Sequence, residues 1–172
     1  MNLNEDVAST LETLFVELAD GAPPHGAYVL NGGDEGLLNA LDSISAEAAS
    51  KNVLGGATVA AHVAHVQYSL ALMNQWARRG GNPFANADWT RAWQIGKVTE
   101  EEWKSLRNSI RTETEMWREV LSQPREVSPV ELNGLIGSIV HLGYHMGALR
   151  QIEPRLRGPQ ESADPSVAEA KK

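Results

Sequence analysis

The segment from Leu132 to Leu149 limits the possible folds of this chain more than any other feature, because it contains no Asp, Glu, Lys or Arg. A clear helix start precedes it: Ser128 can cap the helix, Pro129 suits its first position, and Glu131 can close a capping box. A helix that is apolar nearly all round must be covered on more than one side. Its asparagine, serine, tyrosine and two histidines make a membrane span a poor interpretation. Other helices, from this chain or from a second subunit, are therefore expected around it.

Three further segments show apolar residues at the spacing of an amphipathic helix. One follows Asn4, a suitable N-cap, and a second runs from Thr58 to Arg79 without Gly or Pro and stops at a pair of glycines. The third begins at Thr99, which forms a second capping box with Glu102. The two boxed helices follow each other in the chain, and we expect them to be antiparallel neighbours.

The stretch between the first two of these helices has a different character. Its sequence, DGAPPHGAYVLNGGDEG, is dense in Gly and Pro and predicts a long ordered loop. A short helix is expected after it, from the apolar residues Leu37, Leu38, Leu41 and Ile44. With no β-hairpin signal, the sequence predicts an all-α protein, most simply a four-helix bundle with a short extra helix and a long Gly/Pro loop near the N-terminus. We expect one domain over residues 1–153 and a polar tail over residues 154–172.

Charge and cysteine content argue against several classes of function. The formal net charge is −7 and no long basic run is present, which argues against a nucleic-acid or anionic-membrane partner. The absence of cysteine excludes disulfides, thiolate ligands and a cysteine nucleophile, and it fits a cytoplasmic protein. The first ten residues lack the basic and apolar regions of a secretion signal. A small molecule or another protein is the expected partner.

Four of the five histidines fall on two of the predicted helices. His141 and His145 are four residues apart, so a helix places both on one face. His62 and His65 lie on the second helix, and a third imidazole facing the 141/145 pair would complete a site for a divalent metal. The alternative is that these histidines only form hydrogen bonds in the core or face solvent. Two known metal patterns do not fit, since Leu142 stands where HExxH requires Glu and no Glu-x-x-His occurs.

Two stretches, GATVAAHVAHVQYSLALMNQW and VHLGYHMGALRQI, resemble the DinB-like (DinB/YfiT) superfamily of metal-binding four-helix bundles. The resemblance covers roughly residues 34–152. In the first stretch, Thr58-Val59 leads to a histidine, as in the family. The second stretch matches the family at His141, His145, Gly147, Leu149, Arg150 and Gln151. The resemblance implies a three-histidine metal site at His65, His141 and His145.

The chain also departs from the family pattern. His62 is left over by the three-histidine site; it could line the same interface or donate a hydrogen bond behind a ligand, and we expect it to pack. The long Gly/Pro insertion carries His25, and GGA stands where a tryptophan usually precedes the Thr-Val pair. Both of these changes are expected to touch the entrance to the site.

The resemblance implies a bound divalent ion (Zn, Ni, Fe or Mn) and two kinds of role. One is a metal-dependent transferase or isomerase that uses a low-molecular-weight thiol as cosubstrate, since a metal with open coordination positions lowers the pKa of a thiol. The other is a non-catalytic, metal-binding, dimeric scaffold. No residue is secured as a general acid or base: Asp88 and Glu115 are weak choices, and Tyr144 is expected to point away from the histidines.

Two further expectations concern surfaces. Trp89 and Trp93 lie in the connector after the second helix, where they either wall a substrate pocket above the metal or cap the core. Several small residues on the uncharged helix would let a neighbouring backbone approach closely; they are Gly134, Gly137, Gly143, Gly147 and Ala148. From these and the apolar faces of that helix we expect a homodimer.

Overall fold

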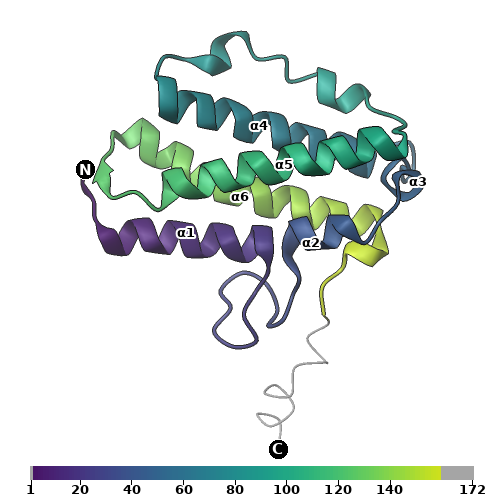
Figure 1. Cartoon of the computed structure of the whole chain (residues 1–172), viewed down its shortest axis with the longest axis horizontal. Helices are drawn as coiled ribbons and strands as arrows, with labels where there is room; N and C mark the ends of the chain where they lie inside the picture. Colours follow the sequence, from purple (N-terminus) through teal and green to yellow (C-terminus); the bar gives the residue numbers. More distant parts are fainter. Residues whose placement is uncertain (1, 160–172) are drawn as a thin grey trace, which may run out of the picture.

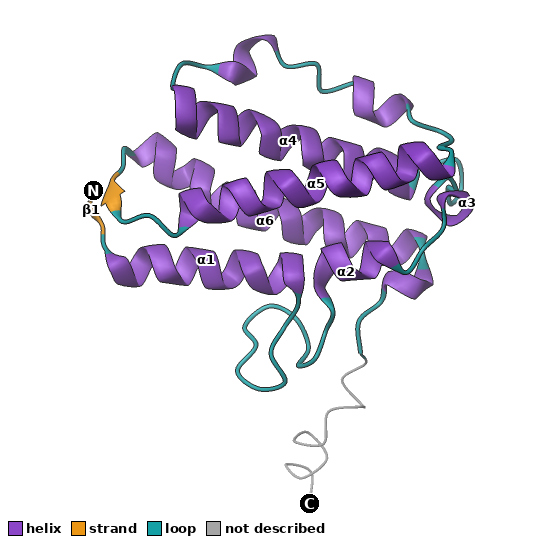
Figure 2. Cartoon of the chain, in the orientation of Figure 1, coloured by secondary structure: helices purple, strands orange, loops and turns teal. Residues whose placement is uncertain are grey.

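The computed structural model describes residues 2–159 and is almost entirely helical (Figures 1 and 2). Its long helices are α1 (Glu5–Asp20), α4 (Val59–Arg79), α5 (Glu100–Leu121) and α6 (Pro129–Ile152). Its short elements are α2 (Gly36–Asp42), α3 (Ala46–Ala49), the 3-10 helices η1 (Pro83–Asn86), η2 (Arg91–Gln94) and η3 (Pro154–Leu156), and the strands β1 (Asn2–Leu3) and β2 (Arg125–Glu126). The prediction of an all-helical class is confirmed, apart from the small antiparallel pairing of β1 with β2.

The helices begin where the sequence signals place them. Thr99 Oγ1 accepts a hydrogen bond from the Glu102 backbone N–H at 3.2 Å, and the Glu102 carboxylate accepts one from the Thr99 N–H at 2.8 Å. Ser128 and Glu131 form the same reciprocal pair at the start of α6. Each box satisfies backbone donors that the first turn of a helix leaves free, which fixes the first residue of α5 and α6.

The long helices run in two directions (Figure 1). α1 and α6 run one way, and α4 and α5 run the other way, so the segment between α4 and α5 must return along the length of the molecule. We call this segment, residues 80–98, the crossover. α1 and α4 each pack against both α5 and α6. The two boxed helices, α5 and α6, are therefore antiparallel but lie diagonally across the core, so the expectation that they are neighbours is wrong.

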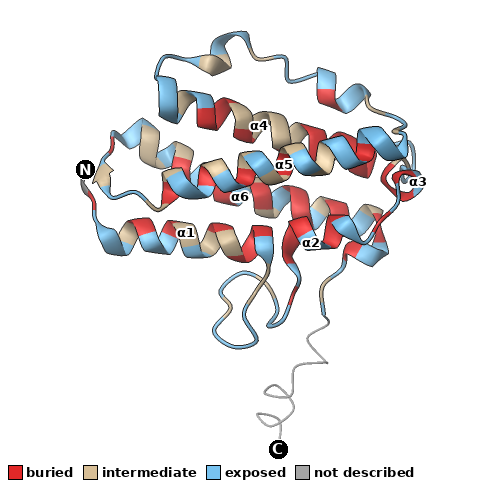
Figure 3. Cartoon of the chain, in the orientation of Figure 1, coloured by how far each residue is buried: buried red, intermediate tan, exposed pale blue. Residues whose placement is uncertain are grey.

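The core lies where the buried faces of the helices meet (Figure 3). Trp103 and Trp117 on α5 are both fully buried, and each indole N–H has a partner. Trp103 Nε1 donates to the Ile44 carbonyl at 3.0 Å, and Trp117 Nε1 donates to Ser138 Oγ at 2.8 Å. The second bond joins α5 to α6 through the middle of the core. A buried indole N–H without a partner would destabilise the fold, so these bonds help to fix how α5 sits against the core.

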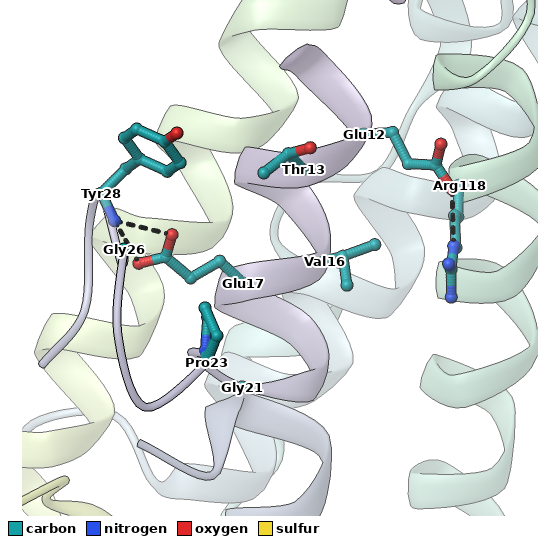
Figure 4. A pocket seen from close by; sticks show the side chains of 9 residues that line it. All are labelled: Glu12, Thr13, Val16, Glu17, Gly21, Pro23, Gly26, Tyr28 and Arg118. Atoms are coloured by element: carbon teal, nitrogen blue, oxygen red, sulfur yellow. Dashed lines mark hydrogen bonds and ion pairs between the residues drawn. The ribbon is translucent and has the colours of Figure 1, made fainter. Parts of the chain in front are cut away.

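A buried carboxylate holds the Gly/Pro loop in place (Figure 4). Glu17 on α1 accepts hydrogen bonds from the backbone N–H groups of Tyr28, Val29 and Leu30, at 2.9, 2.7 and 2.6 Å. The base of the loop closes where Gly21 and Gly36 approach each other. Gly36 has a φ of +72°, and a Cβ there would lie 2.3 Å from the Gly21 nitrogen, so only glycine fits. The loop is thus ordered, as the sequence predicts.

The end of the loop is tied to α6 by a buried ion pair. The Arg150 guanidinium donates to both carboxylate oxygens of Asp34, at 2.8 and 2.7 Å, and the Asp34 side chain is only 2 % exposed. Asp34 also accepts the Gly36 backbone N–H, which starts α2. Arg150, which belongs to the stretch that resembles the DinB-like family, therefore has a structural contact in this chain.

Packing continues beyond the end of α6. Leu156 in η3 is buried in the core, and the Asn31 side chain donates to the Pro159 carbonyl at 2.7 Å. The first residues of the predicted tail are therefore part of the packed structure, whereas residues 160–172 lie outside the described residues. None of the helices within residues 2–159 is both long and apolar enough to cross a membrane.

Candidate metal centre

α4 and α6 pack as antiparallel neighbours and bring four histidines together. His65 from α4 and His141 and His145 from α6 each offer one ring nitrogen, and these nitrogens all lie within 4.8 Å of one another. They are the three residues that the family resemblance implies. Within the described part of the chain, they are also the group of side chains placed to hold a metal ion.

The spacing of the ring nitrogens fits a shared ion. His141 Nε2 lies 3.2 Å from His65 Nε2 and 3.0 Å from His145 Nε2. Two nitrogen ligands about 2.1 Å from one ion, at an angle of roughly 90 to 110°, lie about 3.0–3.4 Å apart. The three imidazoles could therefore hold a divalent ion with little movement of the helices.

The surroundings keep these histidines neutral. Burial, followed by the neighbouring His141, His65 and His62, lowers the pKa of His145 to about 3. Burial, followed by His141 and His62, lowers the pKa of His65 to about 4. Burial also lowers the pKa of His141. Neutral imidazoles have a free lone pair, which is the form that binds metals.

His62 does more than pack, contrary to the expectation from sequence. Its Nδ1 lies 2.9 Å from Nδ1 of His145, on the opposite side of that ring from the nitrogen that faces His141. The ring of His62 is also 5.1 Å from the ring of Trp93, in an edge contact. Helical phase alone places His62 to one side of His65. The hydrogen bond between His62 and His145 depends on the register between α4 and α6, and the sequence does not reveal that register.

The crossover covers the histidine cluster. Trp93 in η2 stacks on His65, with ring centroids 4.5 Å apart and an angle of 29° between the rings. Trp89 lies 5.9 Å from the same imidazole and also contacts Tyr68. Both tryptophans remain 38–39 % exposed. Of the two interpretations of these residues, the structure favours a wall beside the histidines over a cap on the main core.

The structure does not place Asp88, Glu115 or Tyr144 as a general acid or base beside the histidine cluster. The carboxylate of Asp88 accepts hydrogen bonds from the backbone N–H and the hydroxyl of Thr90, at 3.0 and 2.7 Å, and these bonds lower the pKa of Asp88. Glu115 lines a small hollow with Arg111 and Arg118 that includes none of the histidines. Tyr144 is 70 % exposed, although its ring edge contacts His145 at a centroid distance of 5.1 Å.

The Gly/Pro insertion lies away from the histidines. It projects beside α1 and α2, on the other side of the long helices from the crossover (Figure 1). A hollow of about 330 Å³ lies between this loop and α1, where Arg118 forms an ion pair with Glu12 at 2.9 Å (Figure 4). None of the five histidines lines that hollow. The expectation that the insertion and His25 touch the entrance to the site is therefore wrong.

In comparisons with known proteins, no family model, no curated protein and no solved structure matches this chain. The structure itself defines the class: an all-helical protein with a three-histidine cluster between two of its long helices.

Proposed function

We propose that this protein is a metal-binding four-helix bundle of the DinB-like kind, in which His65, His141 and His145 bind one divalent ion. The observation that carries the proposal is the position of His141 Nε2, which is 3.2 Å from one partner nitrogen and 3.0 Å from the other. The lowered pKa values of these histidines add support, because protons do not compete for the ring nitrogens at neutral pH.

The ligand set favours some metals over others. Three imidazole nitrogens without a carboxylate suit Zn²⁺, Ni²⁺ or Fe²⁺ better than Mn²⁺, which prefers oxygen ligands. Three protein ligands also leave at least one position for water or a substrate, as in catalytic rather than structural zinc sites.

For the activity, we propose a transferase or isomerase reaction that uses a low-molecular-weight thiol as cosubstrate. When bound, a divalent ion lowers the pKa of a thiol and so supplies a stronger nucleophile at neutral pH. The chain itself has no cysteine, so the thiol must come from solution, which fits a reducing compartment such as the cytoplasm. Trp89 and Trp93 shield one side of the cluster from water and offer apolar surface to a substrate. The alternative is a non-catalytic metal-binding scaffold.

The test starts from protein purified without a metal-affinity column. Elemental analysis should find about one divalent ion per chain in the wild type and a sharp loss in His145→Ala, while His25→Ala, changed at an exposed loop residue, keeps the ion. Thiols are then screened against epoxides, haloaromatics and maleylpyruvate-like isomers, with and without metal. Metal-dependent thiol consumption, or thiol-dependent isomerisation, supports the enzyme. Stoichiometric metal without turnover supports the scaffold, and a wild type that binds no metal contradicts the whole proposal.

We also propose that two copies of the chain associate through α6. The face of this helix that no other described element covers is uncharged and bears four large exposed side chains: Val130, Ile136, Val140 and Tyr144. A Cβ added at Gly137 or Gly147 on the same helix would meet nothing within 4 Å, which leaves room for a closely approaching helix. Exposed apolar surface of this extent is typical of a protein–protein contact.

A further inference from the structure

We infer that His62 is a positioning residue that fixes which nitrogen of His145 carries the proton; this rests on the proposed metal-binding function. The two Nδ1 atoms lie 2.9 Å apart, within hydrogen-bond distance. At the opposite side of the His145 ring, Nε2 lies 3.0 Å from Nε2 of His141, within the cluster of ligand atoms. One imidazole therefore connects the cluster to a second histidine behind it.

The tautomer follows from counting protons. A neutral imidazole carries one N–H, so a His145 that binds metal through Nε2 must hold its proton on Nδ1. His145 is only 3 % exposed, so an acceptor from the protein is needed for this N–H. Nδ1 of His62 is that acceptor, which requires His62 to be protonated on Nε2 instead. In the opposite arrangement, His62 would donate to Nδ1 of His145, and the proton of His145 would lie on Nε2 and block metal binding.

The other α4 histidine lacks such support. Nδ1 of His65 is buried and has no hydrogen-bond partner among residues 2–159. Its ring is held instead by stacking on Trp93. One turn of α4 thus carries two residues of the site. His65 is a ligand, and His62 is the hydrogen-bond partner of the ligand His145. Partners of this kind orient the ring and raise its basicity, and their loss typically weakens metal binding by about 10- to 100-fold.

Two substitutions of His62 separate this role from packing. His62→Asn places an amide oxygen close to the position of Nδ1 and can still accept the N–H, whereas His62→Leu fills similar space without an acceptor. We expect His62→Leu to weaken Zn²⁺ binding about 10- to 100-fold in a chelator competition assay, and His62→Asn to stay within about threefold of the wild type. In the metal-free state His62→Leu should unfold at a slightly lower denaturant concentration than His62→Asn, because Nδ1 of His145 loses its partner. Zinc affinities are therefore compared under conditions in which both variants are fully folded.

Nuclear magnetic resonance can show directly which ring nitrogen of His145 and of His62 carries the proton. Long-range ¹H–¹⁵N spectra of the zinc-loaded wild type should show His145 protonated on Nδ1 and His62 protonated on Nε2. Wild-type zinc affinity in His62→Leu, equal weakening in both variants, or a His62 that is protonated on Nδ1 would overturn the inference while leaving the metal site intact. A wild type that binds no Zn²⁺ would instead overturn the proposed function, and the role of His62 with it.

Discussion

Four imidazoles in one cluster make the metal-free protein sensitive to acid. The pKa values of His65 and His145 are lowered to about 4 and about 3, mainly by burial, whereas an unfolded histidine titrates near its ordinary value of 6.5. Between these values the unfolded chain binds more protons than the folded chain. The stabilisation of the folded state by neutral histidines is therefore complete above about pH 6.5 and is lost as the pH falls toward the lowered pKa values.

We expect the denaturant midpoint of the chelator-treated protein to fall as the pH is lowered from about 7.5 to about 5, a range in which most carboxylates stay ionised. His145→Gln should reduce this dependence, since the substituted residue does not titrate. The matched control is His25→Gln, which changes an exposed histidine outside the cluster and should keep the wild-type slope. A midpoint that does not change with pH, or an unchanged slope in His145→Gln, would contradict this account.

The residues of the site differ in how far the sequence could predict them. His141 and His145 share a face because of their spacing alone, and His65 was predicted through the family resemblance. A hydrogen bond between His62 and a ligand was one of the alternatives for His62 but not the favoured one, because a half-turn change of register between α4 and α6 would have removed it. The contact of Trp93 with the histidines depends on the path of the crossover, which has no periodic pattern.

At the scale of elements, local signals predicted most of what the structure contains. The predicted caps Asn4, Thr99 and Ser128 mark the starts of α1, α5 and α6, because each satisfies free backbone donors in the adjacent turn. α4 was predicted from a stretch without Gly or Pro, and the structure adds that Thr58 caps it. α3 was missed because four residues cannot display a helical period. The pairing of β1 with β2 was also missed, since it joins residues more than one hundred positions apart, as in Leu3 with Arg125.

The junction between the Gly/Pro loop and α6 gives a prediction about stability. Asp34→Asn should lower the free energy of unfolding by about 3 kcal/mol, because the change leaves the guanidinium of Arg150 without its counter-charge in a mostly buried position. Chemical denaturation monitored by circular dichroism measures this loss.

An exposed ion pair provides the control for that measurement. Arg78 and Glu119 join α4 to α5 at 3.0 Å, but their side chains are 46 and 73 % exposed. Glu119→Gln should therefore change the free energy of unfolding by less than about 1 kcal/mol. If Asp34→Asn lowers the free energy of unfolding no more than Glu119→Gln does, the buried ion pair does not stabilise the loop.

At the scale of the whole molecule, the uncovered face of α6 predicts the oligomeric state. We expect sedimentation of the wild type at micromolar concentration to show a dimer, since Val140 and Tyr144 are 65 and 70 % exposed on an uncharged helix face. Val140→Glu should give a monomer with unchanged helix content, because a carboxylate buried between two subunits lacks a partner. Val53→Glu changes an exposed valine outside α6 and should leave the dimer intact. A wild type that sediments as a monomer would refute the association.

The crossover has a consequence for how such a protein can diversify. Only Ala92 is buried within residues 80–98, although this segment carries both tryptophans that cover the histidines. Phe84, Ile95 and Val98 of the crossover pack against the core, but Trp89 and Trp93 do not. Substitutions at the two tryptophans therefore change the surface that an incoming molecule meets without removing a core contact. Selection on ligand preference and selection on folding thus act on different residues of this chain. Libraries varied at crossover positions such as Trp89 and Trp93 should consequently yield folded proteins far more often than libraries varied along α6.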